Sequence, residues 1–161
     1  MTHGYARLVD VARLAGTGDE FRCAAGLFAD FNREYDDPVP DVDLMTDHLA
    51  RLVDGGDTSV LLAGEPAVAL AIVRFRTATW AAETEAYVAE LYVAPDSRNQ
   101  GLGRRFLTDV LEHCRARGAT YVDLNTSEDD EAARHLYESF GFDCHEGRGE
   151  GPLAIYYEKQ L

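Results

Sequence analysis

Residues 90–106 read E-L-Y-V-A-P-D-S-R-N-Q-G-L-G-R-R-F. The segment that leads into them, residues 85–93, is rich in aliphatic and aromatic side chains and predicts a β-strand. Pro95 ends this strand because proline has no N–H for a ladder. The turn that follows contains Gly101 and Gly103, and a helical pattern begins directly after it. A strand, a glycine turn and a helix N-terminus present unpaired N–H groups and a positive dipole end, which suits a pyrophosphate.

The sequence of this turn excludes two well-known phosphate-binding motifs. The P-loop pattern Gly-x-x-x-x-Gly-Lys-Ser/Thr is absent, and a dinucleotide fingerprint would need glycine in place of Phe106. What remains is Arg-x-x-Gly-x-Gly after a strand that ends in Glu-Leu-Tyr-Val. A second motif, Ala-x-x-Leu-Tyr-x-x-x-Gly-Phe, occupies residues 133–142. In this order the two motifs resemble those of the GNAT superfamily of acyl-CoA-dependent N-acyltransferases, with the close match over residues 85–142.

Length and composition limit the class of protein. The 161 residues fit one domain over residues 1–161, and no run of eighteen apolar residues predicts a membrane span. No signal-peptide pattern is evident at the N-terminus, so a cytoplasmic location is expected. The net charge of −14 argues against a nucleic-acid partner. The three cysteines and five histidines show no disulfide framework and no metal-ligand spacing, so no metal is expected, and Cys114 is expected in the core.

Periodicity and turn signals predict the other elements. Besides residues 85–93, strands are expected at residues 6–14, 58–63, 67–76, 121–125, 142–145 and 153–157. Helices are expected after a cap at Asp19, over residues 43–54, after the glycine turn, and from Ser127 to residue 140. The resulting order, β-α-α-β-β-β-α-β-α-β-β, predicts an α/β (α+β) fold with a mixed, mostly antiparallel sheet and helices on both faces. The GNAT resemblance implies the same order.

The resemblance implies two catalytic residues. Acyl transfer to an amine needs a base for the amine and a proton donor for the leaving thiolate. Glu90 matches the family position that often provides the base; alternatively, it is a strand glutamate that faces solvent or pairs with an arginine. Tyr137 matches the tyrosine that acts as general acid beside the thioester sulfur; alternatively, it is an ordinary amphipathic tyrosine on a helix face.

The resemblance also implies acetyl-CoA as the cofactor. The backbone of the strand would bind the pantetheine amides, and the glycine turn would hold the pyrophosphate. The implied cofactor-binding residues are Leu91, Tyr92, Val93, Arg98, Asn99, Gln100, Gly101, Leu102, Gly103 and Arg104. The family often has asparagine where this chain has Asp130, and a carboxylate there is expected to cap its own helix instead of approaching a pyrophosphate.

The segment between the first two predicted helices is a candidate acceptor site. It contains no basic residue and five acids: Glu34, Asp36, Asp37, Asp41 and Asp43. By resemblance it borders the acceptor entrance, with Phe31 and Tyr35 beside it and Trp80 as a further wall. Acids mixed with aromatic rings suit a small cationic amine through charge attraction and cation–π contact. The alternative is a solvated acidic surface like the rest of the chain.

Two classes of function therefore stay open. The first is an N-acetyltransferase that acts on a primary amine, and the second is a non-catalytic acyl-CoA-binding sensor or partner module. The presence of both Glu90 and Tyr137 favours the enzyme. In addition, the apolar and aromatic residues 153–157 predict a strand at a sheet edge, which invites pairing between chains, so a homodimer is expected.

Overall fold

The computed structural model describes residues 12–146 and 149–161, and the chain divides into two compact units, Met1–Leu124 and Asn125–Leu161. The first unit contains the sheet, and the second contains the last helix and the C-terminal segment. The single domain expected from the chain length stays a prediction.

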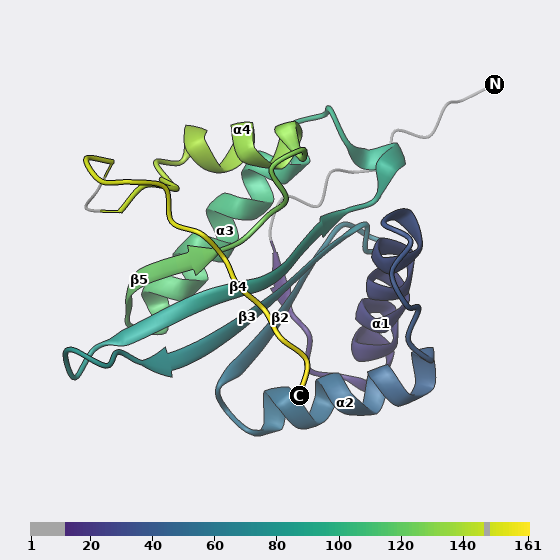
Figure 1. Ribbon diagram of the computed structural model, residues 1–161. Coiled ribbons are helices and arrows are strands. Elements are labelled where there is room, and N and C mark those ends of the chain that lie inside the picture. The colour runs from purple at the N-terminus through teal and green to yellow at the C-terminus, as the bar shows by residue number, and fades with distance from the viewer. Residues whose placement is uncertain (1–11, 147–148) are drawn as a thin grey trace. The chain divides into compact units, whose positions relative to one another are not determined.

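The first unit is built on a five-stranded sheet with the strand order β1-β2-β3-β4-β5 (Figure 1). Its strands are β1 (Arg13–Leu14), β2 (Thr58–Ala63), β3 (Ala69–Thr77), β4 (Thr84–Val93) and β5 (Ala119–Leu124). All neighbouring pairs are antiparallel except β4 and β5, which are parallel because the helix between them returns the chain to the same end of the sheet. The predicted mixed, mostly antiparallel sheet is therefore confirmed.

Helices cover both faces of this sheet. They are α1 (Gly18–Glu34), α2 (Val42–Asp54) and α3 (Leu102–Ala116), with a 3-10 turn, η1 (Pro95–Ser97), before α3. Side chains of β2 alternate between two cores: Val60 and Leu62 pack with α1 and α2, whereas Leu61 and Ala63 pack with α3. Cys114 of α3 is fully buried, as predicted, and burial raises the pKa of its thiol to about 11.

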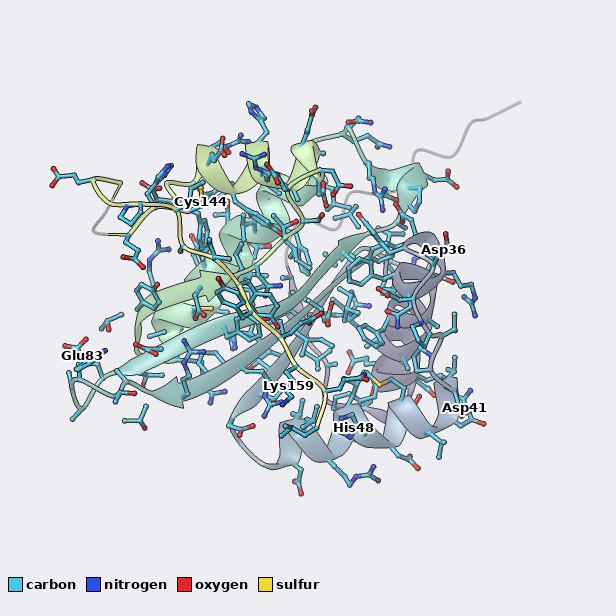
Figure 2. The ribbon with its side chains drawn as sticks, viewed as in Figure 1. Asp36, Asp41, His48, Glu83, Cys144 and Lys159 are labelled. Atoms are coloured by element: carbon cyan, nitrogen blue, oxygen red, sulfur yellow. The ribbon has the colours of Figure 1, made fainter. Side chains whose placement is uncertain are left out.

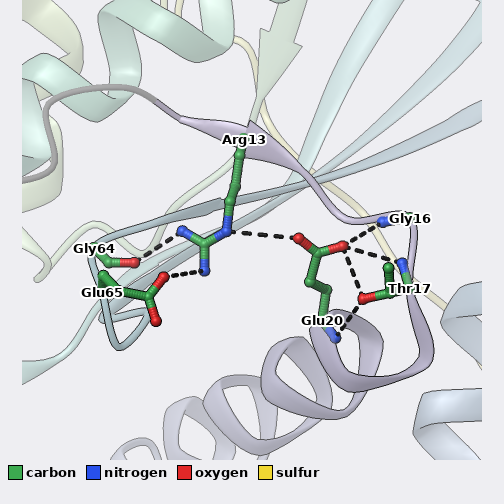
Figure 3. A network of polar contacts seen from close by, with 6 residues as sticks. All are labelled: Arg13, Gly16, Thr17, Glu20, Gly64 and Glu65. Carbon is green, nitrogen blue, oxygen red and sulfur yellow. Dashed lines mark hydrogen bonds and ion pairs between the residues drawn. The ribbon is translucent and has the colours of Figure 1, made fainter.

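The first helix begins two residues earlier than predicted. Thr17, not Asp19, is the N-cap: it accepts a hydrogen bond from the backbone N–H of Glu20, whose side chain in turn accepts from the Thr17 N–H at 3.0 Å. Figure 3 shows that Arg13 extends this capping box, since its guanidinium lies 3.7 Å from Glu20 and donates to the Gly64 carbonyl at 2.8 Å. The contacts join β1, the start of α1 and the β2–β3 turn.

The second unit contains α4 (Glu131–Ser139). Its N-cap is Asp130, whose carboxylate accepts from the Ala133 N–H at 3.0 Å, so the predicted capping role of Asp130 is confirmed and the predicted start at Ser127 is wrong. Neither closing strand predicted at residues 142–145 and 153–157 forms; His145 and Leu153 make only an isolated bridge, since a strand needs a longer ladder with a partner.

Two further expectations concern the first strand and membrane-spanning helices. Of the predicted first strand, residues 6–11 lie outside the described residues, and Arg13–Leu14 are confirmed as strand. Within the described part of the chain, no helix is both long and apolar enough to span a bilayer.

Candidate active site

A β-bulge in β4 determines the face to which Glu90 points. In the register with β3, Val88 lies opposite Val73, but the next pair joins Glu90 to Ile72. Ala89 is therefore an extra residue in β4. Val73 and Val88 belong to the core beneath α3, whereas Ile72 belongs to the core beneath α1 and α2. Because a one-residue insertion moves every following side chain to the opposite face, the bulge places Glu90 on the α1 side of the sheet.

The Glu90 carboxyl group is half-buried, and burial raises its pKa to about 7, with a second contribution from the negative charge of Asp37. Among the described residues it has no arginine or other ion-pair partner, so the alternative of a paired strand glutamate is not observed. A carboxyl group with a pKa of about 7 is divided between its acid and base forms at neutral pH. It can therefore accept a proton from an ammonium group of a bound acceptor.

Beyond the bulge, one edge of β4 is open within the first unit. The pairing of β4 with β5 ends where Val88 meets Leu124, so residues 89–93 are paired with β3 alone. Backbone N–H and C=O groups on such an edge can bind an extended ligand as an added strand would. The amides of a pantetheine chain fit this edge through Leu91 and Val93, as the resemblance implies.

The glycine turn leaves the N-terminus of α3 accessible to an anion. Asn99 and Gly101 both have left-handed backbone angles, with φ of 60° and 74°, and Gly101 is the N-cap of α3 without any side-chain cap. Leu102 and Gly103 are already the first two residues of the helix. The N–H groups of this first turn and the helix dipole fit a pyrophosphate without any contribution from side chains.

Arg98, predicted to contact the pyrophosphate, is engaged within the protein. Its Nη1 and Nη2 donate to the two carboxylate oxygens of Glu34 at 2.6 and 2.7 Å, and its Nε donates to the Val93 carbonyl at 2.8 Å. A phosphate would have to compete with the Glu34 carboxylate for this guanidinium. The backbone of the turn is therefore the better-supported anion site, and a phosphate contact from the Arg98 side chain stays a prediction.

Three of the predicted acceptor residues lie together at the end of α1. The ring of Phe31 stacks on that of Tyr92 with centroids 5.3 Å apart and makes an edge-to-face pair with Tyr35 at 5.1 Å. Tyr35 is 50% exposed, and the exposed Asp36 follows it in a left-handed conformation with φ of 55°. Because Phe31 stacks on Tyr92, which shares a face of β4 with Glu90, this aromatic and acidic group lies on the same side of the sheet as the candidate base.

Trp80 does not join this group, so its predicted role as an acceptor wall is not supported within one chain. It lies in the β3–β4 hairpin with 94% of its surface exposed. Figure 2 shows Glu83 of the same hairpin and Asp36 at opposite ends of the first unit. The strand from Thr84 to Glu90 spans roughly 20 Å at about 3.4 Å per residue. Trp80 is close to β4 in sequence, but the hairpin turn lies at the other end of that strand.

Comparison with known proteins identifies the family. Residues 24–142 match the acetyltransferase (GNAT) family. The chain belongs to this family of acyl-CoA-dependent N-acetyltransferases. The crystal structure of an acetyltransferase-family protein from Arthrobacter sp. FB24 has a TM-score of 0.83 and 36% sequence identity to this GNAT chain, over 94% of it and 97% of the other protein.

Curated relatives match a shorter part of this GNAT chain. A mycothiol acetyltransferase of Thermobispora bispora is 43% identical over 58 residues, which are 34% of this chain and 20% of the relative. A [ribosomal protein bS18]-alanine N-acetyltransferase of Escherichia coli is 38% identical over 58 residues, which are 36% of this chain and 39% of the relative. The chain thus spans about a fifth to two-fifths of these relatives.

In the second unit of the GNAT chain, Tyr137 lies on the apolar face of α4. Four half-buried residues line this face as predicted, namely Ala133, Leu136, Tyr137 and Phe140. The Tyr137 ring makes an edge-to-face contact with Phe142, with centroids 5.9 Å apart. This contact fixes the ring, and the role of its hydroxyl as general acid stays a prediction.

Two residues that shape the candidate site, Ala89 and Glu34, could not be recognised from the sequence. Nothing in the residues around Ala89 distinguishes a bulge from a regular strand. Glu34 was counted only among five acids, although it pairs with an arginine 64 residues away. No local pattern could have indicated that pair, because it depends on the packing of α1 beside β4.

The described residues also hold three consecutive possible metal ligands: Asp143, Cys144 and His145. Figure 2 labels Cys144, the middle one. All three are exposed, and the Asp143 carboxylate accepts hydrogen bonds from the backbone N–H of His145 at 2.8 Å and from its Nδ1 at 2.9 Å. These bonds lower the pKa of Asp143. The contacts account for the close approach of Asp143 and His145 without an ion.

Proposed function

We propose that this chain transfers an acetyl group from acetyl-CoA to a primary amine, and that the acceptor is a small cationic amine. The observation that carries the proposal is the Glu90 carboxyl group. It lies beside the open edge of β4, is turned by the bulge to the α1 side of the sheet, and has a pKa raised to about 7. A base with its pKa near the working pH is the group that amine deprotonation requires.

Different residues of the chain have different roles in the proposed reaction. Acetyl-CoA supplies the acyl group as a thioester. The backbone of Leu91 and Val93 and the first turn of α3 would hold the pantetheine and the pyrophosphate. Glu90 takes a proton from the acceptor ammonium, directly or through water, so that the neutral amine can attack. Tyr137, by its place in the family motif, gives a proton to the leaving sulfur atom.

The preference for a cationic acceptor rests on the group at the end of α1. Phe31 and Tyr35 offer aromatic rings, and Asp36 and Asp37 offer negative charge in the connection that follows. A cationic amine would be attracted by these charges and could lie against a ring face. The acetylated product has lost that charge, so its release would be favoured.

The central experiment is release of free CoA thiol from acetyl-CoA with a panel of primary amines. We expect thiol release with at least one cationic amine, and a rate that rises through pH 7 as Glu90 loses its proton. Glu90→Gln should remove this rise. If acetyl-CoA binds tightly but no amine yields thiol, the chain is an acyl-CoA-binding module and the proposal is wrong.

The acceptor preference has its own test with Asp36→Asn. This change should raise the KM for the cationic amine and flatten its salt dependence, since salt screens exposed charges over about 10 Å at 0.1 M. The KM for acetyl-CoA and the pH profile should not move, because Asp36 is not among the groups that raise the pKa of Glu90. Equal KM values for the amine in parent and variant would leave the acidic segment as ordinary surface.

Two further parts of the proposal concern assembly and location. Residues Leu153, Ile155, Tyr156 and Tyr157 are 59–85% exposed, which leaves an apolar segment available for a second copy. A homodimer is the state we propose, and light scattering that gives the monomer mass over a wide concentration range would contradict it. The cytoplasmic location stays a prediction.

A further inference from the structure

One ion pair joins the two sides of the candidate site. Arg98 follows η1 and precedes the glycine turn, whereas Glu34 is the last residue of α1 and precedes the connection with Asp36 and Asp37. Their side chains meet in a bidentate contact, with N–O distances of 2.6 and 2.7 Å. A paired guanidinium and carboxylate of this kind fixes orientation as well as distance.

Two further contacts hold this pair in one place. The Arg98 guanidinium lies over the Tyr92 ring, 5.6 Å from its centroid, and the hydrogen bond from Arg98, with a smaller contribution from the Tyr92 hydroxyl as donor, lowers the pKa of Glu34. Tyr92 is only 5% exposed and stacks on Phe31, so it is a fixed support. An isolated pair on the surface adds little stability. Here the Nε bond to the Val93 carbonyl and the ring contact tie the pair to the end of β4, so its effect is on geometry.

Glu34 is the residue at which α1 passes into the connection that follows it. Asp37 is three residues beyond Glu34, and its backbone N–H donates to the Asn32 carbonyl in the last turn of α1 at 2.9 Å. Asp37 is also the charged group among the described residues that acts on Glu90. The residue opposite Glu90 on β3 is Ile72, and the neighbours of Glu90 along β4 are Ala89 and Leu91. None of these three residues places a further charge beside the Glu90 carboxyl group.

We propose that the Glu34–Arg98 ion pair holds the connection after α1 beside Glu90, so that Glu34 is a positioning residue for the acceptor amine. Glu34 does not need to touch either substrate for this role. It acts through Asp37 and the neighbouring aromatic ring of Tyr35, which it keeps at the end of β4. The kinetic consequence rests on the proposed function, whereas the structural consequence can be measured without any substrate.

The substrate-free test measures the pKa of Glu90 by following the ¹³C chemical shift of its carboxyl carbon against pH. In Glu34→Gln and in Arg98→Gln we expect this pKa to fall from about 7 toward its ordinary value, because a released connection takes Asp37 away and admits water. A direct field effect would move the two variants in opposite directions, since one loses a negative charge and the other a positive charge. A fall in both variants therefore supports positioning.

The chain offers a matched control for this test. Arg22 and Asp43 form an ion pair at 2.6 Å that joins α1 to α2, with side chains 61% and 75% exposed. Asp43→Asn breaks this pair and should leave the pKa of Glu90 unchanged. In an Asp37→Asn background, Glu34→Gln should lower the pKa of Glu90 by less than it does in the parent, because the charge that it positions is already gone and only the entry of water remains.

A charge-conserving variant separates displacement of the connection from a direct effect of the lost charge. Arg98→Lys keeps the positive charge but cannot make the bidentate contact, so a fall in the Glu90 pKa in this variant reports displacement alone. If the pKa of Glu90 stays at the parent value in Glu34→Gln and Arg98→Lys, or moves in opposite directions in Glu34→Gln and Arg98→Gln, the inference is overturned.

Kinetics complete the experiment with the best amine from the panel. Glu34→Gln should lower kcat/KM for the amine by about 10-fold or more, since a displacement of about 1 Å at a reacting group can cost up to about 100-fold in rate. The KM for acetyl-CoA should not rise. An inactive parent protein would contradict the proposed function, whereas a parent that is active and a Glu34→Gln variant that is equally active would contradict the positioning role.

Discussion

Glu90 should destabilise the folded protein whenever it is ionised. Its pKa rises from an ordinary 4.5 to about 7 because the folded chain buries it and places Asp37 nearby. Below pH 4.5 the carboxyl group is protonated in the folded and the unfolded chain, so it costs nothing. Between pH 4.5 and 7 the unfolded chain loses its proton first, and stability falls as pH rises. Above pH 7 the full cost is present.

The shift sets the size of the effect. At 1.36 kcal/mol per pKa unit it corresponds to about 3 kcal/mol. Because the half-buried side chain keeps some contact with water, which screens its charge, about 1.5 kcal/mol is a better expectation. Glu90→Gln keeps the shape of the side chain without its charge. The variant should therefore gain about 1.5 kcal/mol over the parent between pH 4 and pH 8.5 while losing acetyl transfer.

Urea unfolding of both proteins at pH 4, 5.5, 7 and 8.5 measures this difference directly. Glu158→Gln is a suitable control, since Glu158 is exposed and a surface change of this kind is usually within about 0.5 kcal/mol at any pH. A stability difference between Glu90→Gln and the parent that does not grow with pH would refute the raised pKa. It would also remove the main argument for Glu90 as the base.

Three more changes test separate parts of the molecule. Gly103→Val adds a branched side chain in the first turn of α3 and should abolish acetyl-CoA binding in titration calorimetry while the unfolding transition is kept; an unchanged affinity would remove the pyrophosphate site from this turn. Tyr137→Phe keeps the ring contact with Phe142 but removes the hydroxyl, so the turnover number should fall by about 10²- to 10⁴-fold with the same KM for acetyl-CoA; a variant as fast as the parent would return Tyr137 to a packing role. Thr17→Ala removes the N-cap of α1 and should cost about 1 kcal/mol in urea unfolding, and no loss would mean that the contacts of Glu20 suffice alone.

The sequence by itself determined the order of the elements and the family motifs. The hairpin signal at residues 64–66 located β2 at residues 58–63 without error. The glycine turn indicated that a helix follows, although α3 begins at Leu102 and so includes Gly103, which was predicted to precede the helix. These features are local, because each depends on residues within one or two turns of the chain. The prediction of closing strands at residues 142–145 and 153–157 was wrong because a strand also needs a partner strand, and the local pattern does not specify that partner.

The tertiary structure alone decided the environment of Glu90. In a regular strand Glu90 would share a face with Val88 and point into the core beneath α3; the extra residue Ala89 turns it to the face that α1 covers. Its raised pKa needs burial and the charge of Asp37, which the fold brings from another part of the chain. The pairing of Glu34 with Arg98 across 64 residues has the same origin. Such contacts depend on how helices pack on a completed sheet, and no short stretch of sequence shows which distant residues will meet.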